Sequence, residues 1–210
     1  MINMKKTSLI FYKNNRPVFE VLFLSFFTII FLFIGLDKAP LIDWDENIYA
    51  EASRQMLIRQ DFLNIYINNQ PFAEKPPLFF WLQAFSFYLF GIGEFAARFP
   101  SAFIGFFMTH WIYFVGKRLF SHRFGIFWSL IYTSSFLPGI FAKSAVIDHT
   151  FNFFITVAVF MLIFYDKERI KFNDHFLHYK FNNISEFLWF FLASLSMGLA
   201  VLSKGPLGGV

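Results

Sequence analysis

Six ionisable residues of this chain lie outside its long apolar runs or just inside the ends of those runs. Carboxylates can hold a divalent metal ion, and ammonium groups can hold a phosphate. Charged groups cost free energy in or near hydrocarbon, so a set that shares one depth in a membrane indicates a site. Whether these six share one depth depends on the apolar runs between them. The six ionisable residues are Asp45, Glu46, Glu74, Lys75, Asp148 and Lys204.

The composition is that of an integral membrane protein built from helices. The 210 residues are 57% hydrophobic, and the apolar residues come in long blocks that a soluble fold rarely tolerates. No run alternates in the manner of an outer-membrane barrel strand. The chain has no cysteine, which excludes disulfides and thiolate metal sites. We therefore predict an all-α integral membrane fold.

Five apolar segments are candidates to cross a bilayer as helices, which takes about 20 residues each. They are residues 18–36, 95–114, 124–141, 145–165 and 187–202. Residues 77–90 are apolar but short, and prolines and Gly91 bound them, so we place them at the interface. The predicted organisation is a cytoplasmic segment 1–17, a span 18–36, an outer loop 37–94 with juxtamembrane helices, and about four further spans over 95–210.

Basic residues predict the orientation, because Lys and Arg in short loops mark the cytoplasmic side of a membrane. They precede the first span, separate the second from the third, and separate the fourth from the fifth. The loop 37–76, the turn at Lys143 and the terminal Lys204 then face outward. All six ionisable residues share that outer face, unless residues 77–90 cross the membrane.

The outer loop is expected to contain a helix. Its predicted bounds are Asp45–Arg59, with Asp43 or Asp45 as the N-cap acceptor. One apolar stripe recurs every fourth residue along it and suits a helix that lies on the membrane surface: Ile48, Ala52 and Met56.

Each candidate residue also has an ordinary structural explanation. Asp45 and Glu46 stand at a helix start, where acidic side chains compensate the helix dipole. Glu74 and Lys75 precede two prolines that hold the chain extended, and the two can equally be a solvated surface pair. Lys204 ends the fifth span, where a lysine can simply reach back to the interface.

The same holds for polar residues within or near the spans. Asp148 can be an N-cap of the fourth span with His149 as its partner, and Tyr49 can close a pocket or anchor the interface. Ser194 and Gly198 form a small-residue pair suited to close helix packing. Three further polar residues are expected to form hydrogen bonds between helices: Gln83, His110 and Asn152.

Four short segments resemble the membrane glycosyltransferases that use polyprenyl-phosphate sugars. They are 45–57 (DENIYAEASRQML), 72–78 (FAEKPPL), 94–101 (EFAARFPS) and 202–206 (LSKGP). The last is similar to a Thr-Lys-Gly-Pro segment of that family, with Ser203 in place of Thr. The group includes the aminoarabinose transferases of lipid A and bacterial relatives of protein mannosyltransferases.

The resemblance implies the GT-C architecture, a bundle of many membrane helices with amphipathic helices in the first outer loop. It implies a catalytic carboxylate, a second acid in the same cavity, contacts to the donor phosphate and a ligand for a divalent metal cation. The predicted catalytic residues are Asp45 and Asp148, the predicted substrate-binding residues are Glu46, Tyr49, Lys75 and Lys204, and the predicted metal ligand is Glu74.

Two departures from the family pattern stand out. Family members often carry Arg immediately before the Tyr of the first segment, and this chain has Ile48 there. A contact to the donor phosphate is then missing or supplied elsewhere. Relatives also run to several hundred residues, so this chain of 210 residues is expected to correspond to an N-terminal portion.

The expected activity is inverting, metal-assisted transfer of a sugar from a polyprenyl-phosphate donor to lipid A, another glycolipid or a protein. Membrane lipids are expected partners, and nucleic acid is not. The expected location is a bacterial inner membrane, with a cytoplasmic N-terminus and the site on the outer face. Two alternatives stay open: an inactive truncated remnant, and a non-enzymatic transport or assembly protein. A transporter would bury polar groups near mid-membrane.

Overall fold

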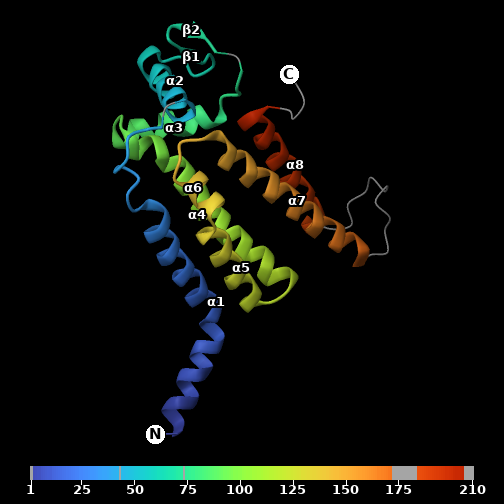
Figure 1. Ribbon diagram of the computed structural model, residues 1–210. Coiled ribbons are helices and arrows are strands. Elements are labelled where there is room, and N and C mark those ends of the chain that lie inside the picture. The colour runs from blue at the N-terminus through green and yellow to red at the C-terminus, as the bar shows by residue number, and fades with distance from the viewer. Residues whose placement is uncertain (1, 43, 73, 172–183, 206–210) are drawn as a thin grey trace.

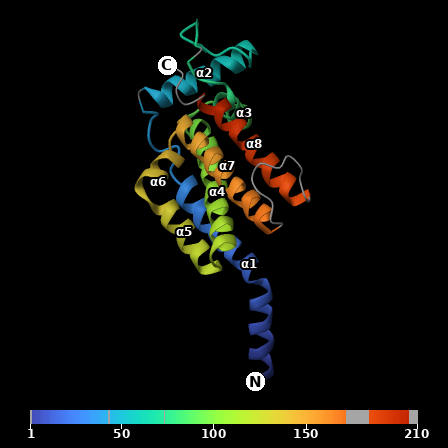
Figure 2. The same cartoon turned by 90° about the vertical axis from the view of Figure 1, so that its right-hand side faces the viewer.

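The structure, a computed structural model, describes residues 2–42, 44–72, 74–171 and 184–205. Long helices lie side by side in a bundle, and two shorter helices with a small β-ribbon lie together at one end of it (Figures 1 and 2). In chain order the elements are α1 (Ile2–Phe33), α2 (Asp45–Arg59), β1 (Tyr66–Ile67), β2 (Gln70–Pro71), α3 (Leu78–Phe90), α4 (Glu94–Leu119), α5 (His122–Ser134), α6 (Phe136–Ala142), α7 (Ile147–Lys171) and α8 (Ile184–Lys204).

Within the described residues, α4, α7 and α8 are each long and apolar enough to cross a membrane. A fourth span results if α5 and α6 are counted as one bent element. The apolar stretch Pro17–Phe33 of α1 and the whole of α3 are shorter. With 13 residues, α3 falls well below the roughly 20 that a span requires. Its depth in the membrane stays a prediction.

The helix predicted over residues 124–141 is broken in the structure. It consists of α5 and α6, which meet at an angle of 69°. Ser135 between them has an extended backbone, with φ −66° and ψ 143°. Pro138 explains the break, because a continuous helix would bring its ring against the carbonyl of Ser134. In the first turn of α6 a proline needs no N–H partner, so the helix restarts there.

The first predicted span, 18–36, also differs from the structure. Helix α1 begins well before residue 18, contains Pro17, and ends at Phe33 rather than at Leu36. The turn that follows includes Gly35 at φ 81°, a left-handed conformation that ends helices and favours glycine.

Helix α4 is the central element and contacts α1, α3, α5, α6 and α7. Polar side chains tie the helices together. His110 of α4 hydrogen-bonds Ser25 of α1 at 2.9 Å. Gln83 of α3 accepts from the Ser53 hydroxyl of α2 at 2.7 Å and donates to a carbonyl of α4. The interhelical roles predicted for His110 and Gln83 are confirmed. Asn152 is instead exposed on α7, without an interhelical partner among the described residues.

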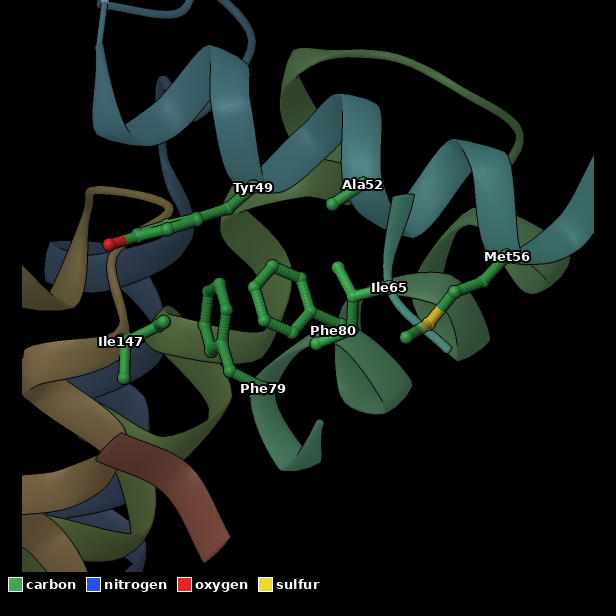
Figure 3. Packing of buried hydrophobic residues seen from close by; sticks show 7 residues of the cluster. All are labelled: Tyr49, Ala52, Met56, Ile65, Phe79, Phe80 and Ile147. Atoms are coloured by element: carbon green, nitrogen blue, oxygen red, sulfur yellow. The ribbon is translucent and has the colours of Figure 1, made fainter. Parts of the chain in front are cut away.

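Helices α2 and α3 pack through a buried apolar cluster at the end of the bundle (Figure 3). The Tyr49 ring meets Phe79 and Phe80 edge-on, with centroids 6.1 and 5.6 Å apart. The predicted stripe residues Ala52 and Met56 are buried in this cluster, so the stripe of α2 packs on α3. The cluster consists of Tyr49, Ala52, Met56, Ile65, Phe79, Phe80 and Ile147.

The start of α2 corrects the predicted N-cap. The helix begins at Asp45, and Trp44 is the N-cap residue, with no side-chain capping hydrogen bond. Asp45 therefore lies in the first helical turn, where its charge still complements the helix dipole. Asp43 lies outside the described residues.

Candidate functional site

Side chains from four parts of the chain line one cavity of about 340 Å³. The start of α2, the segment after β2, the first turn of α7 and the last turn of α8 each contribute to its wall. Six of the seven predicted site residues line it: Asp45, Tyr49, Glu74, Lys75, Asp148 and Lys204. The remaining lining residues are Trp44, Ile48, Phe72 and Ile147.

The cavity and the basic turns lie at opposite ends of the bundle. Lys117 and Arg118 stand in the last turn of α4 and Arg123 in the first turn of α5, and the connection between these helices lies far from α2 (Figure 1). The C-terminal end of α7, with Lys167 and Arg169, lies at that same far end. This arrangement agrees with basic loops on one side of a membrane and the cavity on the other. Which side is outer stays a prediction.

The cavity's charged residues stand at helix ends or in the connecting chain. Asp45 is the first residue of α2, Asp148 the second of α7 and Lys204 the last of α8. Glu74 and Lys75 lie in the segment that leads to α3, just before two prolines. Apolar helices can therefore supply these groups without placing a charge at mid-bundle, where its desolvation would be costly.

Lys204 and Asp148 form an ion pair that joins α8 to α7. The Lys204 ammonium also lies 5.8 Å from the centroid of the Phe151 ring, within reach of a cation–π contact. The alternative that Asp148 pairs with His149 is wrong, because His149 is buried against Gly105 of α4. Lys204 is more than a lysine that reaches the interface, since its ammonium has a carboxylate partner.

Tyr49 forms part of the cavity wall, and the residue is only 5% exposed. Burial raises the pKa of its hydroxyl. The nearby carboxylates of Asp45, Asp148 and Glu74 raise it further, as does a hydrogen bond with the Asp45 side chain. Tyr49 therefore stays protonated at neutral pH. It serves as a hydrogen-bond donor to Asp45 and cannot act as a base there.

Glu46 is the one predicted site residue that the structure keeps out of the cavity. Its side chain is 2% exposed, and both carboxylate oxygens have partners within the protein. Arg98 donates to them at 3.0 and 2.8 Å, and the backbone N–H groups of Ile42 and Ala145 donate at 2.8 and 2.6 Å. This placement replaces the predicted substrate contact with a structural role.

Arg98 is a key residue that the sequence analysis did not single out. Besides Glu46, its guanidinium donates to the carbonyls of Leu36, Ala39 and Pro40 at 2.7–2.9 Å. Arg98 and Glu46 together fix the chain after α1, the start of α2 and the turn before α7. Asp45 lies at the start of α2, and Asp148 follows directly after the turn, in the first turn of α7. An arginine near the start of a predicted span, where an unpaired charge is costly, was the signal that could have identified it.

The metal ligand set is incomplete in the described residues. Glu74 is exposed and can supply one carboxylate. The described part of the chain brings no three His, Cys, Asp or Glu residues together as a metal-binding group. Asp148 is also already paired with Lys204. The residues present thus do not make a metal site by themselves, and a divalent cation stays a prediction.

Comparison with known proteins adds three findings. Over residues 21–210 the chain matches the family described as dolichyl-phosphate-mannose-protein mannosyltransferase. The undecaprenyl phosphate-alpha-4-amino-4-deoxy-L-arabinose arabinosyl transferase of Photorhabdus laumondii is 35% identical over 149 residues, which is 70% of this chain and 27% of that protein. The third finding is a likeness to solved structures.

The structure resembles ArnT from Cupriavidus metallidurans in two crystal structures. The apo form has a TM-score of 0.78 and 24% identity, over 92% of this chain and 34% of that one. The form bound to undecaprenyl phosphate has a TM-score of 0.77 and 25% identity, over 90% of this chain and 33% of that one. The chain thus spans about a third of the length of these relatives.

Proposed function

The chain belongs to the dolichyl-phosphate-mannose-protein mannosyltransferase family, and on that premise we propose that its cavity binds a polyprenyl-phosphate sugar and takes part in transfer of the sugar. The predicted all-α, GT-C-type membrane fold is confirmed by family membership and by the likeness to ArnT. The activity itself, its substrates and its partners are proposals, because the chain spans about a third of its relatives.

One observation carries the proposal: the cavity gathers carboxylates and ammonium groups from separate elements at one end of an apolar bundle. A donor of this class has an isoprenoid tail that dissolves among apolar helices and a phosphate that remains near the interface. Lys75 and Lys204 supply cations for such a phosphate. The relative that binds undecaprenyl phosphate has the same fold, which supports the assignment.

The reaction places demands that these residues can meet. Transfer breaks the bond between the anomeric carbon and a phosphate oxygen, and negative charge builds on the leaving phosphate. Lys75 and Lys204 stabilise that charge in the cavity. Asp45 accepts the proton of an attacking hydroxyl, and the hydrogen bond from Tyr49 orients its carboxylate. A single displacement of this kind inverts the anomeric centre.

The acceptor decides whether a base is needed. A hydroxyl of a glycolipid or protein loses a proton as it attacks, whereas a phosphate oxyanion of lipid A has none to lose. With a phosphate acceptor, Asp45 would orient the reacting groups. A divalent cation would contribute further charge stabilisation at the leaving phosphate, with Glu74 as one of its ligands. The expected location is a bacterial inner membrane, with the cavity on its outer face.

The test uses the chain in liposomes with a polyprenyl-phosphate sugar. Binding of the donor is measured first, and the expected result is a clear loss of affinity in the Lys75→Met and Lys204→Met variants. Transfer to hydroxyl and phosphate acceptors is measured next, with Asp45→Asn as the decisive variant. Donor affinity that is unchanged without both lysines would contradict the phosphate site. Near-normal turnover of Asp45→Asn with a hydroxyl acceptor would exclude Asp45 as the base.

A further inference from the structure

We propose that Trp44 is the surface on which a sugar ring stacks in this cavity. The inference rests on the proposed function and adds a residue that determines sugar recognition. Trp44 lines the cavity and directly precedes Asp45. Its backbone, its position in the helix and its exposure each need an explanation that packing does not provide.

The backbone of Trp44 is in an unfavourable conformation. Its φ is 90° and its ψ is −113°, and a positive φ is a genuine outlier for a bulky residue. The conformation is fixed from the helix side, because the Trp44 carbonyl accepts the first hydrogen bond of α2 from Ile48 at 2.9 Å. Outliers of this kind concentrate at functional sites, where the surrounding structure holds them.

The residue type is also a poor choice for the position. An N-cap favours Ser, Thr, Asp or Asn, whose side chains accept a hydrogen bond from the first turn. Glycine would relieve the positive φ. Tryptophan does neither, and its side chain makes no capping bond. The indole itself is therefore what this position supplies.

Trp44 lines the cavity and is strongly exposed. Trp44 is 80% exposed, whereas the other four tryptophans are all partly buried. No aromatic or cation–π contact covers its ring among the described residues. A flat apolar face beside a polar cavity fits the C–H face of a sugar ring, whose hydroxyls point sideways to polar neighbours. Asp45, Glu74 and the protonated Tyr49 line the same cavity and supply such neighbours.

The ordinary alternative is that Trp44 anchors the outer loop at the membrane interface, as exposed tryptophans often do. The two roles differ in what they require. An anchor needs any sufficiently large apolar side chain and acts on every lipid ligand equally. A stacking surface needs an aromatic ring and acts only on ligands that carry a sugar.

The experiment compares two lipids, a polyprenyl-phosphate sugar and the same polyprenyl phosphate without the sugar. Each is titrated by calorimetry against the chain in nanodiscs, for wild type, Trp44→Ala, Trp44→Leu and Trp44→Phe. We expect Trp44→Ala and Trp44→Leu to lower the affinity for the sugar-bearing lipid about 2- to 10-fold and to leave the affinity for the bare polyprenyl phosphate unchanged. Phe should retain most of the affinity. Phe136→Ala is the matched control, because Phe136 is also 80% exposed but does not line this cavity.

A third ligand identifies the source of the sugar. A glycolipid without phosphate represents the acceptor, and loss of its affinity in Trp44→Ala would assign the stacked ring to the acceptor. Equal weakening of all lipids, or a Leu variant that behaves like Phe, would show an anchor and overturn the inference. Unchanged affinities in Trp44→Ala would overturn it as well. If the wild type binds neither phosphate lipid, the proposed function itself fails, and this inference fails with it.

Discussion

Lys204 and Asp148, which lie 56 positions apart in the chain, form an ion pair between the end of α8 and the first turn of α7. Their side chains are 34% and 36% exposed, so water screens the pair and its net contribution is small. Under the proposed function, a phosphate that enters the cavity would compete with Asp148 for the Lys204 ammonium. Lys75 has no carboxylate partner among the described residues.

This competition gives the first prediction, which concerns phosphate binding. Asp148→Asn frees Lys204, so affinity for a bare polyprenyl phosphate should rise about 2- to 5-fold, which corresponds to an exposed pair of roughly 0.5–1 kcal/mol. Lys204→Met should lower the affinity. Both are measured by calorimetry in nanodiscs. Asp166→Asn, at the other end of α7, is the control and should change nothing. Reduced phosphate affinity in Asp148→Asn would show that Asp148 assists binding rather than competing.

The buried pair of Arg98 and Glu46 gives the second prediction, which concerns stability. Their side chains are only 6% and 2% exposed. Arg98→Met leaves the Glu46 carboxylate buried without its cation and should lower the free energy of unfolding by about 3–5 kcal/mol. The double variant Arg98→Met, Glu46→Gln should recover part of that loss, because no uncompensated charge remains. Unfolding in detergent micelles provides the measurement.

An exposed ion pair on α2, the helix that carries Glu46, serves as the comparison for the buried pair. Arg54 and Glu51 also form a two-bond ion pair, but their side chains are 37% and 33% exposed. Glu51→Gln should therefore cost less than about 1 kcal/mol. If Arg98→Met were no more destabilising than Glu51→Gln, the buried pair would not be what holds the chain between α1 and α2 in place.

The third prediction is a dependence of stability on pH. Burial opposes ionisation of Glu46, but hydrogen bonds from Arg98, Ile42 and Ala145 outweigh it and hold the pKa of Glu46 below its ordinary 4.5. Near pH 4.5 the unfolded chain therefore binds more protons than the folded one, and stability rises with pH. The stabilisation is present above the ordinary pKa and is lost as pH falls through the lower folded value.

Thermal unfolding at several pH values between about 3 and 7 checks this linkage. The wild type should lose stability more steeply below about pH 4.5 than Glu46→Gln, which has no proton to take up at that position. Parallel profiles for the two proteins would mean that Glu46 does not titrate with folding. The comparison uses slopes, so the lower overall stability of the variant does not affect it.

Much of the cavity could be predicted from the sequence, because charged residues are conspicuous in an apolar chain and hydropathy fixes which ends of the helices meet. Adjacent residues could not be told apart. Asp45 and Glu46 have similar side chains, but successive positions of a helix point about 100° apart. One side chain therefore faces the cavity, and the other reaches Arg98, which lies 52 positions away. Only the packing of α2 on α3 and α4 decides that Asp45 faces the cavity and Glu46 reaches Arg98.

Trp44 and the break between α5 and α6 escaped the sequence analysis for different reasons. Tryptophan is ordinary near an interface, and nothing in the sequence reports a positive φ. The break could not be predicted from hydropathy, because Phe, Leu and Ile continue through it and the apolar pattern is that of one span. Pro138 was the available signal, and its effect depends on whether the chain can restart a helix beyond Ser135.

The last prediction compares two glycines in membrane helices. A Cβ at Gly125 of α5 would lie 2.7 Å from the Tyr113 carbonyl oxygen and 2.9 Å from the Lys117 nitrogen. Both atoms belong to the backbone of α4 and cannot move aside cheaply. Gly125→Ala should therefore force α4 and α5 apart and lower the free energy of unfolding by about 1–3 kcal/mol. Thermal unfolding in detergent measures it.

Gly198 of α8 is the matched control. A Cβ there meets nothing within 4 Å, and the neighbouring small residue Ser194 is exposed. The predicted close packing of these two residues is therefore not seen among the described residues. Gly198→Ala should be neutral or slightly stabilising, because alanine favours a helix over glycine by about 1 kcal/mol. Marked destabilisation by Gly198→Ala would mean that another helix packs closely on this face of α8. Ser194 and Gly198 would then have the role in close helix packing that their spacing predicts.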